Sequence, residues 1–188
     1  MKKKLMRFLK WFAIVILVLL GIGVIGFQIM KHNTKKHSPE TTLKYEENGM
    51  DIEIVYSRPF KKDRKIFGGL VPYGEVWRTG ANEATRFKTE TDLIIDGKTL
   101  PKGEYTLWTI PNKSSWEVIF NNGEYGWGVN MQSEAARDPE YDVLSVSVPV
   151  QRNFKVLEQF TIEVEGTPPA LLFSWDVTRV DVPLSKVN

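Results

Sequence analysis

The sequence contains no cysteine and only two histidines, and these shortages exclude several kinds of active site. A chain without thiols forms no disulfide, carries no thiol-linked lipid and offers no thiolate nucleophile. Both histidines, His32 and His37, precede the stretch that has the composition of a folded domain. That domain therefore lacks the imidazole and thiolate groups that Ser-His or Cys-His catalysis requires, and it lacks zinc sites built from these ligands.

Phosphate-binding motifs and a positive domain charge are lacking as well. The sequence has no glycine-rich loop of the P-loop or dinucleotide-binding type. Residues 40–188 hold seventeen Lys/Arg and twenty-three Asp/Glu, a net charge of −6, and an acidic domain is repelled by nucleic acid. The oxygen-rich stretch RDPEYD (137–142) fits no known calcium loop. We therefore expect no nucleic acid partner, no cofactor and no metal site.

A long apolar run is present near the N-terminus. Residues 11–30 carry no charge over twenty positions, which as a helix of ~1.5 Å per residue reaches ~30 Å, the thickness of a bilayer's hydrocarbon core. We predict a transmembrane anchor; the alternative is a secretory signal, whose apolar core is usually shorter and ends in a small-residue cleavage site. Five Lys/Arg precede the run and three follow it closely. This bias favours a single-pass membrane protein with a cytoplasmic N-terminus and an extracytoplasmic domain.

The flanking segments set the predicted domain limits. Residues 1–10 form a basic cytoplasmic N-terminus, and residues 11–30 form the anchor. The stretch 31–42 is polar, contains a proline and lacks hydrophobic periodicity, which is typical of a juxtamembrane tether. The remaining residues, 43–188, form the folded domain.

This domain shows strand patterns along most of its length. Apolar and polar residues alternate in DIEIVYS (51–57), VLSVSVPV (143–150) and FTIEVEG (160–166), as in half-buried strands. Asp96-Gly97 predicts a type I′ hairpin turn. The one helix candidate, QSEAARDPE (132–140), is short. Many short strands and few helices predict an all-β fold, a β-sandwich of jelly-roll-like type, on one N-terminal transmembrane helix.

Five of the six tryptophans fall in this domain. Trp108, Trp116 and Trp175 stand on predicted strands, so we expect them in the core. Trp77 and Trp127 lie in glycine-containing loops, where a core position and a pocket or surface role are both open.

The stretch SRPFKKDRKIFGGLVPYGEVWRTGANEAT (57–85) has the residues best suited to a ligand site. Arginines can bind a carboxylate or sulfate, an amide can orient it, and a tryptophan can form a wall. The alternative is a long ordered loop held by an internal Arg–Glu network. The candidate ligand-binding residues are Arg58, Arg64, Tyr73, Trp77, Arg78, Asn82 and Glu83.

Two glutamates of this stretch, Glu75 and Glu83, allow a second hypothesis. A carboxylate pair can supply general acid and base in glycoside hydrolysis when the two groups lie ~5–9.5 Å apart. In the competing interpretation Glu75 is a solvated turn residue and Glu83 is an ion-pair partner of Arg78. No spacing rule ties the two glutamates to a mechanism, so no catalytic residue is assigned.

The same stretch resembles the signature of a bacterial envelope family, domain of unknown function 2911 (DUF2911). The resemblance covers about residues 50–182, and it is carried by the stretch 57–85 together with IDGKTLPKGEYTLWTIP, WEVIFN and YDVLSVSV. It implies an exported or membrane-anchored β-rich domain, and it implies no activity, cofactor or catalytic residue. Arg78, Asn82 and Glu83 match the family motif.

We therefore expect an envelope-located, membrane-anchored module that binds a glycan, a peptide or a partner protein through the loop of residues 58–85. Two alternatives stay open. One is a carboxylate-dependent hydrolase that acts on envelope glycans, and the other is a structural envelope component without a small ligand. Whether the chain is an enzyme is left open, with a binding role favoured.

Overall fold

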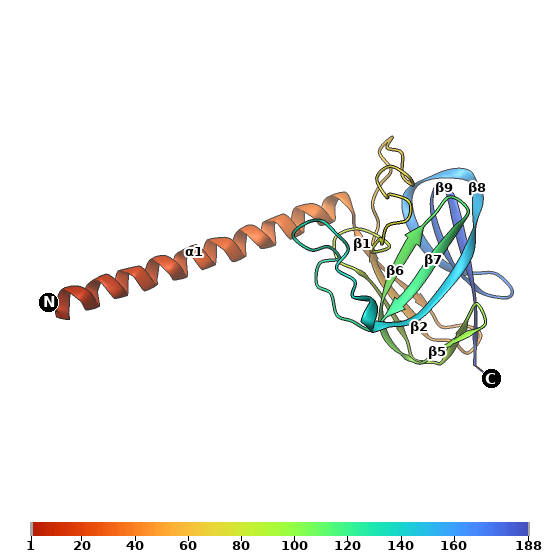
Figure 1. Ribbon diagram of the computed structural model, residues 1–188, viewed down its shortest axis with the longest axis horizontal. Helices are drawn as coiled ribbons and strands as arrows, with labels where there is room; N and C mark the ends of the chain where they lie inside the picture. Colours follow the sequence, from red (N-terminus) through yellow and green to blue (C-terminus); the bar gives the residue numbers. More distant parts are fainter. Residues whose placement is uncertain (1, 188) are drawn as a thin grey trace. The chain divides into compact units, whose positions relative to one another are not determined.

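The N-terminal segment is a single long helix. The computed structural model describes residues 2–187, and its contacts divide the chain after His37 into a helical unit and a β domain. Helix α1 (Lys2–His37) contains the uncharged run 11–30 (Figure 1). The helix is long and apolar enough to cross a membrane, and a secretory signal at this position has the same properties. Residues 31–37 continue the helix, and the first strand begins at Glu40.

The β domain is one large open antiparallel sheet of nine strands. The strands are β1 (Glu40–Tyr45), β2 (Ile52–Ser57), β3 (Thr85–Thr89), β4 (Leu93–Ile95), β5 (Lys98–Leu100), β6 (Gly103–Pro111), β7 (Ser115–Asn121), β8 (Asp142–Glu165) and β9 (Ala170–Lys186). Their order in the sheet is β1-β2-β3-β6-β7-β8-β9-β4-β5. The β4–β5 hairpin leaves the sequential order, because β4 pairs with the C-terminal end of β9.

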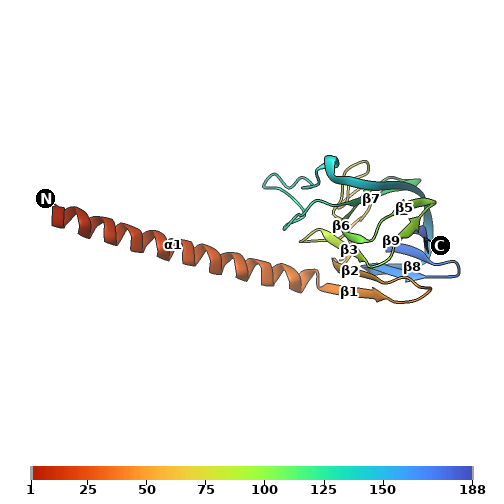
Figure 2. The same ribbon diagram turned by 90° about the horizontal axis from the view of Figure 1, so that it is seen from below.

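The two long strands, β8 and β9, extend the sheet around its core. The first part of β8 pairs with β7, and the rest pairs with β9 across two register shifts. Figures 1 and 2 show β8 as a long curved ribbon. Its second part reaches back to β2, where the Tyr56 hydroxyl donates to Ile162 O (3.2 Å) and accepts from Ile162 N (2.9 Å). The two layers of the expected sandwich therefore belong to one continuous sheet.

The main core lies between these layers and is rich in aromatic rings. It draws side chains from β2 to β9, including Ile54, Phe87, Leu107, Phe120, Phe160, Ile162, Phe173 and Val182. Trp116 and Trp175 belong to it and are 1% exposed. Trp108 is fully buried in a second, smaller cluster with Ala84 and Ile119. The predicted core positions of these three tryptophans are confirmed.

Local sequence signals explain several elements, and the all-β class with one N-terminal helix is confirmed. Asp96 and Gly97 join β4 to β5 with φ of 45° and 78°, as a type I′ turn requires. The expected helix at 132–140 is wrong, since only Pro139–Tyr141 form one turn of 3-10 helix. The Asn130 side chain accepts from the backbone N–H of Gln132 (2.9 Å) and of Glu134 (3.0 Å), which favours a turn over a helix.

Candidate functional site

Two of the predicted ligand-binding arginines hold the loop of residues 58–84 in its conformation. Arg58 donates from Nε to Phe160 O (3.0 Å) and from Nη2 to Thr161 Oγ1 (2.8 Å), which fastens the start of the loop to β8. Arg64 is exposed and donates to two backbone carbonyls of its own turn, Lys61 O (3.0 Å) and Phe60 O (2.5 Å). The geometry gives both guanidinium groups a structural task.

Trp77 anchors the middle of the loop. Its backbone forms an antiparallel bridge with Thr109 of β6, with N···O distances of 2.7 and 2.9 Å. Its indole N–H donates to Gly80 O (3.0 Å). The ring packs on the main core at centroid distances of 5.0–6.1 Å from Phe67, Trp116, Phe160 and Trp175. The tryptophan is half-buried and contributes mainly to packing.

Tyr73 and Glu75 lie on an exposed turn that precedes Trp77. The Tyr73 ring packs on Gly68, where a Cβ atom would lie 2.4 Å from the ring. The turn is tied to the end of β6 by a hydrogen bond from Gly74 N to Pro111 O (2.9 Å). Glu75 therefore occupies the solvated turn position of the competing interpretation.

The backbone between Arg78 and Asn82 adopts an unusual conformation. Thr79 and Asn82 have φ of 53° and 61°, a region that β-branched residues rarely enter. Thr79 is fully buried, and its carbonyl accepts from Thr85 Oγ1 (2.7 Å). The side-chain amide of buried Asn82 donates to Ser38 O (3.4 Å), and the backbone carbonyl of Asn82 accepts from Gly128 N (3.1 Å). Such a conformation costs a residue like Thr79 ~1–3 kcal/mol, so the surrounding contacts must hold the loop in this shape.

Arg78 carries a half-buried charge that no acid among the described residues balances. Among residues 2–187 its guanidinium forms no ion pair, and its Nε is enclosed without a hydrogen-bond partner. Burial lowers the pKa of Arg78, and no neighbouring charge opposes that effect. The Arg78–Glu83 ion pair of the competing interpretation is therefore not formed, and half-buried Glu83 has other interactions. A charge taken out of water without a partner costs several kcal/mol, and proteins keep such groups mainly where they serve a function.

Gly128 makes the enclosure of Arg78 possible. A Cβ atom at this position would lie 2.4 Å from Arg78 Cδ, 2.8 Å from Arg78 Cβ and 3.1 Å from Ala84 N. The glycine belongs to the segment of residues 122–138, which we call the cover segment. The cover segment and the Arg78 loop meet over the smaller core cluster of Trp108 and Ile119.

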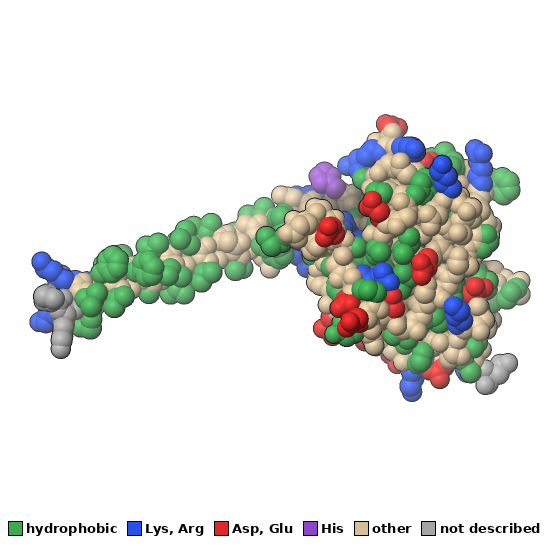
Figure 3. All heavy atoms as spheres, viewed as in Figure 1, with side chains coloured by type: hydrophobic (Ala, Val, Ile, Leu, Met, Phe, Trp, Pro, Cys, Tyr) green, Lys and Arg blue, Asp and Glu red, His purple; other side chains and the backbone are tan. Residues whose placement is uncertain are grey.

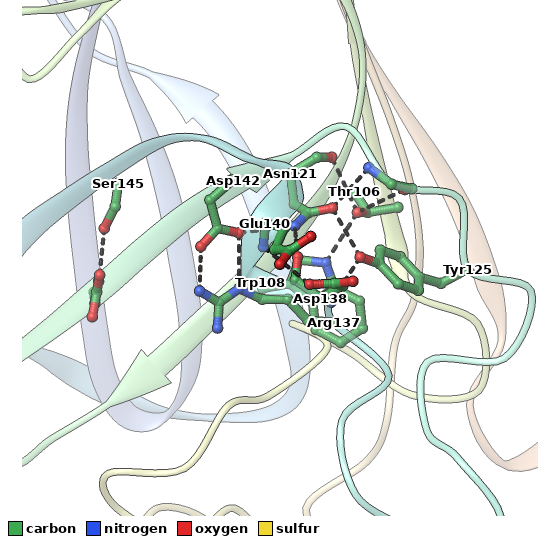
Figure 4. Close-up of polar contacts among 11 residues, drawn as sticks. Thr106, Trp108, Asn121, Tyr125, Arg137, Asp138, Glu140, Asp142 and Ser145 are labelled. Carbon is green, nitrogen blue, oxygen red and sulfur yellow. Dashed lines mark hydrogen bonds and ion pairs between the residues drawn. The ribbon is translucent and has the colours of Figure 1, made fainter.

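Asn121, at the end of β7, fastens the cover segment to the sheet (Figure 4). Its side chain is fully buried and makes four hydrogen bonds. Oδ1 accepts from Gly123 N (2.8 Å) and from the Tyr125 hydroxyl (3.1 Å), and Nδ2 donates to Asp138 O and Asp142 Oδ1 (2.8 Å each). Both ends of the cover segment are thus held by one residue.

An ion pair supports the same junction. The Arg137 guanidinium donates to both carboxylate oxygens of Asp142, as Figure 4 shows. Burial acts to raise the pKa of Asp142, but hydrogen bonds from Arg137 and Asn121 and the charge of Arg137 outweigh it and hold the pKa below its ordinary value. This arginine therefore has what Arg78 lacks, a carboxylate partner.

A groove of about 690 Å³ lies beside the cover segment, on the outer face of β2, β3 and β6. It is lined by Glu53, Val55, Arg86, Phe87, Lys88, Glu104, Tyr105, Thr106 and residues 122–126. Lys88 pairs with Glu90 (2.8 Å) and Glu104 (3.6 Å). The hydrogen bond and the charge of Glu90 are the main reasons that the pKa of Lys88 is raised, and Glu104 adds to the effect. Arg86 is exposed and has no ion pair within the described residues. The groove thus contains one unneutralised cation and the fixed ring of Tyr125.

Comparison with known proteins identifies the family. The model of a family described as "Protein of unknown function (DUF2911)" matches residues 38–184. The chain belongs to the DUF2911 family. The match begins at Ser38, one residue after α1 ends, so this DUF2911 domain coincides with the β domain. Neither the search of the curated proteins nor that of the solved structures found a match.

The sequence of this DUF2911 member pointed to the loop of residues 58–84 that contains Arg78, but it did not point to the cover segment. Half-buried Trp127 drew attention to EYGWG, but the neighbouring Gly128 is the residue that contacts Arg78. The usable signal was the density of glycines in that stretch, because glycine permits close approach of a backbone. The hydrogen bonds of Asn121 carry no such local signal.

Proposed function

We propose that this DUF2911 member is a membrane-anchored binding module of the bacterial envelope and that Arg78 binds an anionic group of its ligand. The observation that carries the proposal is the half-buried guanidinium of Arg78, which has an enclosed Nε and no counter-ion among the described residues. An arginine fork donates two parallel hydrogen bonds to a carboxylate or sulfate oxygen pair. A bound anion would supply Arg78 with the negative counter-charge that the described residues do not provide.

The ligand class that fits this site is a glycan, peptide or partner protein bearing a carboxylate or sulfate. The cover segment borders both features, since Gly128 packs on Arg78 and Tyr125 lines the groove. The groove's volume of about 690 Å³ falls in the range of small-ligand pockets. Its polar lining and its tyrosine ring suit an acidic saccharide or an acidic peptide better than an apolar molecule.

The other candidate residues take different parts in this proposal. Arg58, Arg64 and Trp77 hold the loop in shape, as their hydrogen bonds indicate. Tyr73 is 37% exposed and is offered as a ligand contact. Asn82 and Glu83 flank the ligand from the strained turn.

The anchor is the second part of the proposal. Helix α1 spans the membrane, the basic N-terminus stays in the cytoplasm, and the β domain lies outside, in agreement with the excess of Lys/Arg before the apolar run. Retention of the full chain in membranes after alkaline carbonate extraction, together with protease access to the β domain from the outer side only, tests this arrangement. A soluble, N-terminally shortened product would identify the helix as a secretory signal.

Ligand binding is tested by calorimetric titration of the full chain in detergent with a uronate oligosaccharide, a sulfated oligosaccharide and an acidic peptide. We expect Arg78→Met to weaken binding by about 10- to 150-fold, because a hydrogen bond to a charged group contributes ~1.5–3 kcal/mol. Arg78→Lys keeps the charge and loses the fork, so it should give an intermediate affinity.

The matched control is Arg152→Met, an exposed arginine outside the groove, which should leave the affinity unchanged. If the groove takes part, Arg86→Met should weaken binding less than Arg78→Met does. An affinity that is the same for wild type and Arg78→Met would refute the role of Arg78.

A further inference from the structure

Positive charge is concentrated in two short segments of an otherwise acidic domain. Residues 61–65 (KKDRK) and 152–156 (RNFKV) hold six of the seventeen Lys/Arg of residues 40–188 and only one of their twenty-three Asp/Glu. Together the ten residues carry +5, and the other residues of the domain therefore carry −11. We call these two segments the basic rim.

The two segments of the basic rim lie side by side. Phe60 forms an antiparallel bridge with Gln159, and Lys61 N donates to Glu158 O (2.6 Å). The first rim segment therefore begins beside Glu158, which lies two residues after the end of the second rim segment. In Figure 3 Lys and Arg side chains gather along the upper edge of the β domain, where Figure 1 draws the loop that follows β2.

Apolar side chains project from the same rim. Phe154 is fully exposed, and Val156 is 60% exposed, although both stand within a strand whose other apolar residues are mostly buried. The register of β8 against β9 shifts between Arg152 and Leu157, so this stretch bulges out of the ladder. An exposed aromatic ring flanked by cations is the composition of a segment that inserts among lipid headgroups.

The chain enters the β domain close to the start of the loop that carries the first segment of the basic rim. Pro39, two residues after the end of α1, accepts a hydrogen bond from Arg58 N (2.9 Å), three residues before the rim begins. If residues 11–30 cross the bilayer, the seven helical residues 31–37 extend only ~10 Å beyond the hydrocarbon. The headgroup layer is ~5–8 Å thick on each side. The rim is therefore tethered within reach of the lipid surface.

We infer that the basic rim docks the β domain on the anionic surface of the membrane that holds α1. The exposed cations of the rim contact acidic phospholipid headgroups, and Phe154 inserts between the headgroups. Half-buried Lys61 stays paired with Asp176 (3.9 Å). The inference rests on the proposed anchor and is independent of ligand binding at Arg78. In this arrangement the rim fixes how the β domain is held above the bilayer, whereas the Arg78 region binds the ligand.

The test uses the full chain in nanodiscs with a single nitroxide label. Because the sequence has no cysteine, Val156→Cys gives one unique labelling position, and Thr99→Cys in β5 gives the reference. In nanodiscs of phosphatidylcholine and phosphatidylglycerol, we expect the label at 156 to be accessible to oxygen and shielded from a polar nickel reagent. In phosphatidylcholine alone, or at 1 M salt where the screening length falls to ~3 Å, it should behave like the label at 99.

Charge variants decide whether the rim itself is responsible. Each cation near an anionic surface strengthens attachment about 5-fold, so Lys65→Glu combined with Lys155→Glu should lower the docking constant about 25-fold or more. The matched control is Lys102→Glu combined with Lys186→Glu, two exposed lysines near β4 at the other end of the strands. This control should leave docking unchanged.

Three results would overturn the inference. The label at 156 could stay exposed to the nickel reagent in anionic nanodiscs, the control pair could weaken docking as much as the rim pair, or a soluble polyanion could bind the rim with no effect of bilayer charge. Retention of the chain in the nanodisc, read by size-exclusion chromatography, reports on the anchor separately. Loss of the chain from the disc would refute the proposed membrane anchor. A retained chain with an exposed label would refute only the proposed docking of the rim.

Discussion

Replacing Arg78 by methionine is expected to stabilise the β domain. The guanidinium has no counter-ion among the described residues and its Nε has no hydrogen-bond partner, so the folded state carries a desolvation cost that the unfolded chain does not. Methionine keeps an unbranched apolar chain of similar length under Gly128 and removes the charge. Substitution of buried charges by packed apolar residues is often neutral or stabilising by ~1–4 kcal/mol.

The size of the effect follows from the partial burial of Arg78. Because the side chain as a whole is half-buried, the lower part of that range applies, about 1–2 kcal/mol. At ~2–4 °C per kcal/mol for a domain of this size, the midpoint of thermal unfolding should rise by about 2–8 °C. The measurement is a thermal melt of the full chain in detergent, followed by near-ultraviolet circular dichroism of the buried tryptophans.

Arg137→Met is the matched control, because Arg137 has the carboxylate partner that Arg78 lacks. Breaking a buried pair costs ~3–5 kcal/mol and breaking an exposed one ~0–1 kcal/mol; for this half-buried pair we expect about 1–3 kcal/mol, so the midpoint should fall by about 2–12 °C. A comparable fall for Arg78→Met would refute the reasoning, since it would mean that Arg78 is a structural cation. A rise in stability together with loss of ligand binding would identify a group retained for function at the expense of stability.

Three further outcomes are expected. Gly128→Ala should destabilise the domain by ~1–3 kcal/mol through crowding of the Arg78 side chain, and in urea titrations the loss should shrink when Arg78 is alanine; equal losses in both backgrounds would contradict the contact. Tyr56→Phe should cost ~1–3 kcal/mol, because it leaves buried backbone groups of β8 without their partner, and an unchanged urea midpoint would argue against this link between β2 and β8. Asp142 has a folded-state pKa below its unfolded value of ~3.9, so its contribution is fully present above about pH 4 and is lost as the pH falls through the folded-state pKa. Asp142→Asn should flatten the acid limb of a plot of melting midpoint against pH, and an unaltered limb would exclude this carboxylate as its cause.

Strands with buried faces were predictable because alternation reports burial. The sequence predicted β2 and both buried parts of β8 from apolar residues at every second position, and their inward faces are buried as expected. β1 escaped prediction because it is an edge strand whose residues alternate only between exposed and half-buried. The two predicted strands at 143–150 and 160–166 are parts of one β8, and the polar stretch between them hides that continuity.

The candidate site shows a different limit. The motif of Arg78 and Asn82 pointed to an unusual loop, and the loop is strained and buried there. Whether an arginine has a partner depends on what lies across from it in space. Gly128, fifty residues away in the sequence, faces Arg78, and a glycine offers neither charge nor hydrogen-bonding side chain. The isolation of this cation therefore could not be predicted from its own neighbourhood in the sequence.

The pairing of β4 with the end of β9 constrains the order in which the domain is assembled during synthesis. Leu93 lies opposite Lys186, so β4 cannot pair with β9 until the ribosome has made the chain as far as residue 186. Ile95 and Leu100, both fully buried in the finished domain, must wait in a partly folded chain until then. Domains with such distant pairings fold slowly and expose apolar surface meanwhile. Until β9 has been made, these apolar side chains are therefore open to aggregation and to chaperones that bind exposed apolar segments.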